Sequence, residues 1–415
     1  MYILNKENIN MTIGVGGSTA EIELAKLSNM TTEVEAISEA EYKQRIKKAQ
    51  QIMRANNIAA TYVNAGTNLY YFTGTRWYAS ERMVGAIIPA QGDIQYIVPY
   101  FEVNTLSQYM TIFGPVNGWQ EHESPYQLFN DVLAKLKITQ GNIAFDESTA
   151  FFIVNGIAEL NKHLVICDGK IVTAGCRSQK SDTEIALLQQ AKNMTMVVHK
   201  AVARILREGI TTQEVESFIN AAHIKVGAPA GSYFCIVLFG KDSSFPHGVK
   251  TPKNLEENDI VLIDTGCQIE GYNSDITRTY VFGEANQRQR DMWQIEKQAQ
   301  LAAFEAALIG TACGDVDVAA RDYLAGQNMG PDYQTPGCPH RTGHGVGLDI
   351  HEWPYLVRND RTPLAKGMCF SNEPMLVIPG EFGVRLEDHF YMTDSGAKWF
   401  TEPSHSIDDP FGYQI

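Results

Sequence analysis

Two pairs of acidic residues constrain the fold of this chain most, because each pair has the spacing of a strand–turn–strand hairpin. Asp264 and Asp275 lie in two strand-like runs, residues 260–265 and 275–282, around a turn that contains Gly271. Opposed residues of an antiparallel hairpin are equally far from the centre of its turn. The two aspartates are therefore predicted to face each other across a turn centred between residues 269 and 270, with Cβ atoms about 5 Å apart.

The second pair repeats this arrangement. Glu373 and Glu387 are equally far from Gly380, and the dipeptide Pro379-Gly380 is typical of a type II turn. The match is good to about one residue, so the hairpin can contain a bulge. Two hairpins that each present a facing carboxylate pair predict an internal pseudo-repeat.

One histidine completes a set of side chains suited to metal ions. His344 lies in Gly-His-Gly-Val-Gly, residues 343–347. Carboxylates with one imidazole suit hard or borderline divalent ions and do not suggest a thiolate zinc site. Four carboxylates at one place repel each other unless cations neutralise them, and two divalent ions would do so while forming a hydrolytic centre. The predicted metal ligands are Asp264, Asp275, His344, Glu373 and Glu387.

The motifs around these residues resemble, in the same order, those of the pita-bread metallopeptidases: Xaa-Pro dipeptidases (prolidases), Xaa-Pro aminopeptidases and methionine aminopeptidases. They are Ile-Asp-Thr-Gly at 263–266, Ser-Asp-Ile-Thr-Arg-Thr at 274–279, the His344 motif, Asn-Glu-Pro at 372–374 and Arg-Leu-Glu-Asp at 385–388. The resemblance covers nearly the whole chain. It implies an α/β creatinase-like N-terminal domain and an α+β pita-bread catalytic domain with a curved antiparallel sheet and internal pseudo-symmetry. Relatives usually carry two manganese ions, although cobalt, iron or zinc would also suit these ligands.

The resemblance also implies three histidines around the substrate. His247, in Ser-Phe-Pro-His at 244–247, and His351, in the segment 348–354, are expected to hold the substrate and stabilise the oxyanion. His340, four residues before His344, is expected to line the pocket of the leaving proline.

Two further roles follow from the resemblance. Glu373 is expected to act both as a ligand and as the base that moves the proton of the attacking water. Arg385 is expected to orient Glu387 from outside the ligand shell, with Asp264 as a second candidate partner. Thr277 shares the aspartate face and is expected to hydrogen-bond a ligand.

Two positions depart from the family pattern. Gly248 follows His247 where many relatives carry His or Tyr, and His389 stands where relatives often have Thr. Neither change removes a metal ligand, and both are expected to affect substrate choice. His389 and the other remaining histidines receive no role from the sequence.

The chain is expected to form two domains, residues 1–176 and 177–415. Strand and helix patterns alternate up to about Val172, which predicts an α/β domain. Capping boxes at Ser181 and Thr211 then predict the starts of two helices. The segment 67–74 also resembles the N-terminal domain of the family, in whose dimers the following loop reaches the partner's active site. Arg76 and Trp77 are therefore candidates for substrate contact in a homodimer.

Charge and cysteine use limit the possible partners and environment. A net charge of −14 argues against nucleic acid and anionic membranes. Seven widely spaced cysteines without Cys-x-x-Cys predict a reducing compartment. The sequence has neither the pattern of a signal peptide nor an apolar run of about 18 residues, so a cytoplasmic protein is expected.

The predicted reaction is hydrolysis of the bond between an N-terminal residue and a following proline in peptides, a specificity that only the resemblance implies. The alternative is another metal-dependent hydrolase or lyase of the same fold, acting on a non-proline or non-peptide substrate. Gly266 disfavours it, because some such relatives carry an acid at that position. A pseudoenzyme is disfavoured because all five ligands are present.

Dipeptidase and aminopeptidase both remain open. A dipeptidase must recognise a free carboxylate next to the proline, usually with an arginine. Arg358 and Arg361 lie between His344 and Glu373 and are candidates, although an exposed loop explains them equally well.

Overall fold

The computed structural model describes residues 11–414. These residues form two compact units, one of residues 36–177 and one of residues 11–35 together with 178–414. The expected absence of a signal peptide rests partly on residues 1–10, which lie outside the described residues. Among the described helices, none combines the length and the apolar character needed to cross a membrane.

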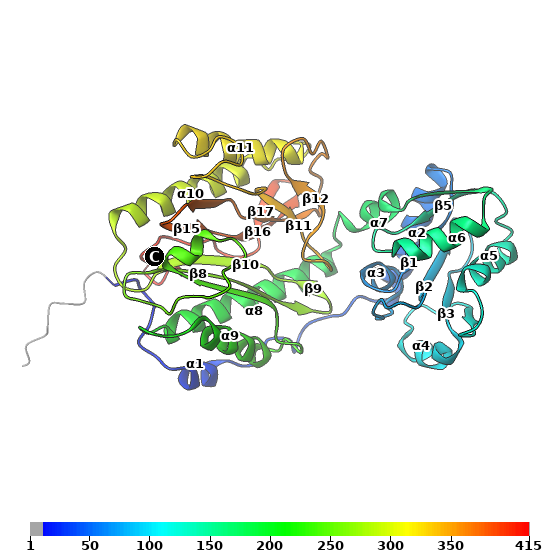
Figure 1. Cartoon of the computed structure of the whole chain (residues 1–415), viewed down its shortest axis with the longest axis horizontal. Coiled ribbons are helices and arrows are strands. Elements are labelled where there is room, and N and C mark those ends of the chain that lie inside the picture. Colours follow the sequence, from blue (N-terminus) through cyan, green and yellow to red (C-terminus); the bar gives the residue numbers. More distant parts are fainter. Residues whose placement is uncertain (1–10, 415) are drawn as a thin grey trace, which may run out of the picture. The chain divides into compact units, whose positions relative to one another are not determined.

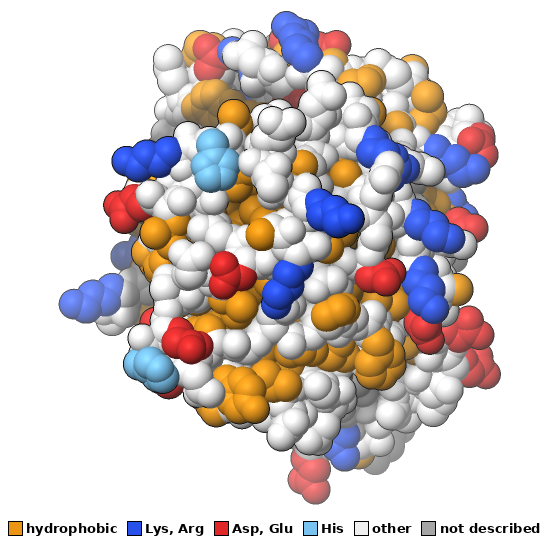
Figure 2. Space-filling model, turned by 90° about the vertical axis from the view of Figure 1, so that its right-hand side faces the viewer, with side chains coloured by type: hydrophobic (Ala, Val, Ile, Leu, Met, Phe, Trp, Pro, Cys, Tyr) orange, Lys and Arg blue, Asp and Glu red, His pale blue; other side chains and the backbone are white. Residues whose placement is uncertain are grey.

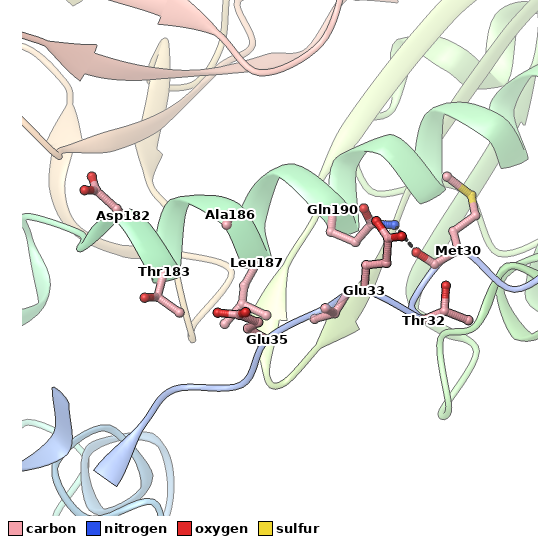
Figure 3. A pocket seen from close by; sticks show the side chains of 10 residues that line it. Met30, Thr32, Glu33, Glu35, Asp182, Thr183, Ala186, Leu187 and Gln190 are labelled. Carbon is pink, nitrogen blue, oxygen red and sulfur yellow. Dashed lines mark hydrogen bonds between the residues drawn. The ribbon is translucent and has the colours of Figure 1, made fainter. Parts of the chain in front are cut away.

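The structure departs from the expected N-terminal domain of residues 1–176 at its beginning, because residues 11–35 pack on the second unit. The backbone N–H of Thr12 donates to Gly283 O and that of Met30 to Val226 O, both at 2.9 Å. The side chain of Gln190 donates to Met30 O at 2.7 Å, as the dashed line in Figure 3 shows. This polar segment has little apolar surface for a core of its own, so its backbone groups find partners on an existing unit.

The unit of residues 36–177 is built on a six-stranded mixed sheet of order β4-β3-β2-β1-β5-β6. Its strands are β1 (Ile58–Asn64), β2 (Gly85–Pro89), β3 (Gln95–Pro99), β4 (Val116–Trp119), β5 (Gly141–Phe145) and β6 (Leu164–Asp168). Its helices are α2 (Glu39–Ala55), α3 (Thr67–Thr73), η1 (Tyr100–Glu102), α4 (Val103–Tyr109), α5 (Pro125–Lys135), α6 (Phe151–Leu160) and α7 (Lys170–Arg177).

Helices cover both faces of this sheet, as the alternating sequence pattern predicts. Successive residues of β1 point to opposite faces. Ala60 and Tyr62 pack in one core with Phe129 of α5. Thr61 points to the other face, where its hydroxyl donates to the sulfur of Met53 on α2 at 3.0 Å. In Figure 2, which views the side to the right of Figure 1, hydrophobic side chains are interspersed with charges of both signs.

The second unit contains two helix pairs on opposite sides of its strands (Figure 1). The first pair, α8 (Asp182–Ile205) and α9 (Thr212–Val226), begins with the capping boxes predicted at Ser181 and Thr211. It accompanies an antiparallel sheet of order β10-β8-β7. The strands are β7 (Ser232–Phe239), β8 (Ile260–Ile269) and β10 (Ile276–Val281), with β9 (Tyr272–Asn273) pairing to the end of β8. The short elements α1 (Ala20–Lys26) and η2 (Gly240–Ser244) belong to the same unit.

The second helix pair is α10 (Gln287–Ala306) and α11 (Cys313–Gly326). It covers an antiparallel sheet of order β12-β11-β13-β16-β17, with Ala303 and Val316 packed in one core with Phe370 and Phe390. The strands are β11 (Gly343–Gly345), β12 (Glu352–Leu356), β13 (Cys369–Asn372), β16 (Asp388–Thr393) and β17 (Gly396–Trp399), beside the hairpin of β14 (Met375–Ile378) and β15 (Phe382–Arg385). Each half therefore contributes a helix pair and a hairpin that carries acids, as the expected pseudo-repeat requires.

Candidate metal centre

The first acidic pair lies on one side of its hairpin, but the predicted register is wrong. Asp264 of β8 pairs with Thr277 of β10, and not with Asp275. The turn is centred between Glu270 and Gly271, whose φ angles of 50° and 83° suit a two-residue hairpin turn. Asp275 lies two residues before Thr277, in the break between β9 and β10, so the two aspartates are diagonal neighbours.

Polar groups of α8 hold this break open. The ammonium group of the fully buried Lys192 donates to Asn273 O at 3.1 Å, and the hydroxyl groups of Thr195 and Ser274 are 2.7 Å apart. These contacts fix the two residues before Asp275, and the register is the same on both sides of the break. Asp275 therefore lies on the same face as Thr277, and its carboxylate enters the same cavity as Asp264.

The second acidic pair has the predicted register. Both the β14–β15 hairpin and the β13–β16 ladder have their centre at Gly380. The pairing stops at Glu373 and Glu387, which lie between these two ladders. Their backbone N–H groups donate instead to Thr342 O at 2.8 Å and Thr277 O at 3.1 Å. The two glutamates are thus equivalent positions at a break in the sheet.

His344 presents one ring nitrogen to these acids. Its Nδ1 donates to Gly345 O at 3.0 Å, so the neutral ring has its lone pair on Nε2. This Nε2 lies 3.0 Å from a carboxylate oxygen of Glu373 and 3.7 Å from one of Asp275. The tautomer fits a metal ligand, because a backbone carbonyl fixes the other nitrogen.

The side chains converge tightly enough to share metal ions. Three groups each have ligand atoms within 4.8 Å of one another: Asp275, His344 and His351; Asp275, Glu387 and His389; and His344, Glu373 and Glu387. Asp264 is absent from these groups but lies in the same cavity. Among the described residues, three buried atoms in this cluster have no hydrogen-bond partner: Asp264 Oδ1, Asp275 Oδ1 and His344 Nε2. Buried oxygens and an imidazole lone pair without partners are the donors that a divalent ion requires, so the residues fit the predicted metals.

The charges of the cluster show the same need for cations. Burial raises the pKa of Asp275 well above its usual value, and the charges of Asp264 and Glu373 raise it further. Burial, followed by the charges of Asp275 and Glu373, likewise raises the pKa of Glu387. Burial acts to raise the pKa of Glu373 as well, but the neighbouring His344 outweighs it and lowers this pKa.

Arg385 connects the two acidic pairs. Its guanidinium donates to Asp264 Oδ2 at 2.6 Å and to the hydroxyl of Thr277 at 3.1 Å. The same hydroxyl donates to Glu387 Oε2 at 2.8 Å, so the expected hydrogen bond from Thr277 to a ligand is confirmed. Arg385 reaches Glu387 only through Thr277, whereas it binds Asp264 directly.

The three histidines expected around the substrate, His247, His340 and His351, line one cavity of about 590 Å³. The same cavity is lined by Asp264, Asp275, His344, Glu373 and Arg385. His247 and His351 are exposed, and His340 is half-buried with its Nδ1 donating to Arg341 O at 2.7 Å. Partial loss of water around the His351 ring, which lines the cavity, lowers its pKa to about 4, and the neighbouring His344 contributes. The ring centroids of His351 and His344 are 4.2 Å apart. The catalytic roles of these residues stay predictions.

His389 is a possible ligand that the sequence did not identify. It is fully buried, its Nε2 lies 3.4 Å from Glu387 Oε1, and its Nδ1 has no partner among the described residues. Burial is also the main reason why its pKa lies well below the usual value, so the ring is neutral. The sequence feature that could have identified His389 as a ligand is its position two residues after Glu387, because alternate residues of a strand share a face.

The arginines suggested for a substrate carboxylate are engaged elsewhere. Arg358 pairs with Asp332, and Arg361 lies 3.5 Å from Asp315. Neither lines the cavity. In the other unit, the Arg76 guanidinium lies 4.1 Å from the Tyr70 ring centroid, and Trp77 packs edge-on against Tyr109. A contact of Arg76 and Trp77 with a partner's site stays a prediction.

Comparisons with known proteins agree with this geometry. Residues 186–394 match the family described as Metallopeptidase family M24, and residues 45–179 match the Creatinase/Prolidase N-terminal domain. The chain is 31% identical to a putative dipeptidase, YkvY, of Bacillus subtilis, over 86% of this chain and 97% of that one. It is 31% identical to an Xaa-Pro dipeptidase of Pyrococcus furiosus, over 88% and 99%. The crystal structure of dipeptidase PepE from Mycobacterium ulcerans superposes with a TM-score of 0.82 at 29% identity, covering 90% of this chain and 98% of that one.

Proposed function

The chain belongs to metallopeptidase family M24, and we propose that it hydrolyses the bond between an N-terminal residue and a following proline with two divalent metal ions. The observation that carries this proposal is that four of the five expected ligands line one cavity and the fifth, Glu387, has a ligand atom within 4.8 Å of those of His344 and Glu373. Buried donor atoms in this cluster lack partners among the described residues. The proline specificity is supported by relatives that bear the name Xaa-Pro dipeptidase.

We assign the metal ions to Asp264, Asp275, His344, Glu373 and Glu387, with His389 as a possible sixth ligand. Ions bound there would supply Lewis acidity and a water molecule that is nucleophilic near neutral pH. Manganese as the native metal and a cytoplasmic location stay predictions.

Other residues of the cavity receive roles from their positions. Glu373 lines the cavity beside the other ligands, and we propose that its carboxylate accepts the proton of the attacking water. We propose that His247 and His351, which line the cavity, donate an N–H to the carbonyl oxygen of the scissile bond. Tyr233, Ile236 and Ile350 give the cavity an apolar lining that suits a proline ring.

The alternative of a lyase or a non-peptide hydrolase is less compatible with the local backbone. A Cβ atom at Gly266 would lie 1.8 Å from Ser274 O, so an acidic residue at this position requires a different backbone.

The test of the proposed function is an assay with Ala-Pro and Ala-Pro-Ala after chelation and reloading with manganese. We expect hydrolysis next to proline, two ions per chain by elemental analysis, and loss of activity in the chelated protein. Failure to cleave either peptide with two ions bound would contradict the proline specificity.

We also propose a homodimer in which Arg76 and Trp77 approach the partner's cavity. Supporting it, Tyr78 beside them is 92% exposed, and Tyr109, which packs on Trp77, is 58% exposed. Large apolar side chains left in contact with water favour burial in an interface. Sedimentation analysis of wild type and Tyr78→Ser tests this, with a weaker dimer expected for the variant.

A further inference from the structure

We propose that Arg341 binds the free carboxylate of a dipeptide substrate and so makes this chain a dipeptidase. The inference rests on the proposed function and adds the group that distinguishes dipeptides from longer peptides.

Arg341 is the available cation of the cavity. Two arginines line the cavity, Arg341 and Arg385. Arg385 is buried, and its guanidinium donates to Asp264 and Thr277. In contrast, no carboxylate among residues 11–414 forms an ion pair with Arg341, which is half-buried. A cation that lines a substrate cavity without an internal counter-ion is suited to bind an anion from outside the protein.

An aromatic ring supports the guanidinium. The guanidinium carbon of Arg341 lies 4.3 Å from the ring centroid of Tyr355 on β12. Stacking on an aromatic face holds the plane of an arginine while its N–H groups remain available at the edge. Tyr355 itself belongs to a strand paired with β11, which carries His344. The arginine is thus supported by the same sheet that presents a metal ligand.

Arg341 is close enough to the catalytic residues to influence them. Its neighbour in sequence, His340, lines the same cavity, and His340 Nδ1 donates to the backbone carbonyl of Arg341. His351, directly before β12, lines this cavity as well. An anion bound by Arg341 therefore lies in the field of the groups expected to contact the scissile bond.

The other candidates do not offer this combination. Arg358 has an ion pair with Asp332, Arg361 is exposed next to Asp315, and neither lines the cavity. No lysine occurs among the described residues that line it.

The charges of the cavity match those of a dipeptide. A dipeptide carries an ammonium group and a carboxylate, and the cavity has an acidic cluster and one free guanidinium. In a longer peptide a neutral amide takes the place of that carboxylate, and the charge moves at least one residue further, roughly 3.5 Å. The amide offers the guanidinium only a neutral acceptor in place of a charged one, so the cavity discriminates against longer peptides.

The experiment compares Ala-Pro with Ala-Pro-amide, which differ only in this charge, using manganese-loaded wild type, Arg341→Gln and Arg341→Lys. Arg358→Gln is the matched control, because it removes an arginine outside the cavity. For wild type we expect kcat/KM to be about 10–100-fold higher on Ala-Pro, the usual size for hydrogen bonds to a charged group. Arg341→Gln should lose this preference, mainly through KM on Ala-Pro, with Ala-Pro-amide unaffected. Arg341→Lys should retain part of it, and Arg358→Gln all of it.

Two results would overturn the inference alone: equal losses on both substrates in Arg341→Gln, or a preference for Ala-Pro that survives the substitution. Equal wild-type rates on Ala-Pro, Ala-Pro-amide and Ala-Pro-Ala would also overturn it while leaving the proposed function in place. No cleavage of any of the three would overturn both. Thermal unfolding of each variant shows whether the fold is intact.

Discussion

The two halves of the catalytic unit each deliver two carboxylates to the metal centre, but they use different backbone arrangements. In the first half, Asp264 lies in a continuous strand and only Asp275 lies at a break. In the second half, both Glu373 and Glu387 lie at a break between two ladders that keep one register. Similar hairpin spacings therefore give one diagonal pair and one pair of equivalent positions.

The helices that support these breaks also differ. In the first half, Lys192 of α8 donates to the carbonyl of Asn273. In the second, the Gln300 amide of α10 donates to the carbonyls of Asn372 and Leu386 at 3.3 and 3.0 Å. Each of these carbonyls lies one or two residues before a metal ligand. Gln300 thus holds both ligand segments of its half, whereas Lys192 holds one, and the second half depends more on a single side chain.

The largest effect should come from removing a ligand from either half. Asp275→Asn and Glu387→Gln preserve shape but remove the charge that binds metal. We expect each to lose at least one ion per chain and to lower kcat/KM by more than about 100-fold, the upper range for residues outside the ligand shell. Elemental analysis and the Ala-Pro assay measure both. Full activity with fewer than two ions in either variant would show that the halves do not contribute equally to a binuclear centre.

The support from the helices should give the next largest effect. Gln300→Met leaves three acceptors without this donor, Asn372 O, Leu386 O and Asp388 Oδ2. We expect a loss of about 1–3 kcal/mol in the free energy of unfolding and about 10–100-fold weaker metal binding. Lys192→Met removes one such contact and should weaken metal binding less. Urea unfolding and metal titration of both variants test the order, and a larger effect on metal binding in Lys192→Met would reverse the comparison.

His389 has a smaller expected effect, confined to the second half. If its imidazole binds metal beside Glu387, His389→Gln should weaken one ion by about 10-fold or more and alter the visible spectrum of the cobalt-loaded protein. His405→Gln, at a histidine outside the cavity, is the control. A cobalt spectrum identical to that of wild type would exclude His389 from the ligand shell.

The smallest expected effect concerns pH, because one buried titratable side chain in each half should change the free energy of unfolding in opposite directions. Burial lowers the pKa of His199, on α8, to about 3. The unfolded state therefore takes up this proton first, and the free energy of unfolding falls as pH drops below about 6.5. Burial raises the pKa of Glu296, on α10, well above its usual value. The unfolded state then releases this proton first, and stability falls as pH rises above about 4.5.

Substitutions separate these two contributions. Glu296→Gln should raise the urea midpoint at pH 7–8 relative to wild type and leave it unchanged near pH 4. His199→Gln should reduce the loss of stability between pH 6.5 and 5. The same pH profile in Glu296→Gln and wild type would show that this carboxyl does not titrate as its burial implies.

Local patterns in the sequence were sufficient where the interaction is local. The capping boxes at Ser181 and Thr211 and the centre of the second hairpin at Gly380 involve residues close in the chain. The first hairpin was misplaced by one residue at its centre, because the prediction took Asp264 and Asp275 as directly opposed, whereas the turn at Glu270 and Gly271 makes them diagonal neighbours. The contacts of Lys192 and Thr195 with the break before Asp275 join residues more than 70 positions apart, and a local pattern contains no information about them.

By itself, the sequence determined which five residues are proposed as ligands, the family to which the chain belongs and where helices α8 and α9 begin. Only the tertiary structure decided that residues 11–35 pack on the catalytic unit, that His389 joins the acidic cluster, and that Arg341 and not Arg358 faces the cavity. The physical reason is that the sequence gives the chemical type of each side chain. Whether the hydrogen-bond donors of that side chain are available to a ligand depends on which other residues the fold brings next to them. Arg358 and Arg341 are the same residue type, and the difference between them is that Asp332 pairs with Arg358.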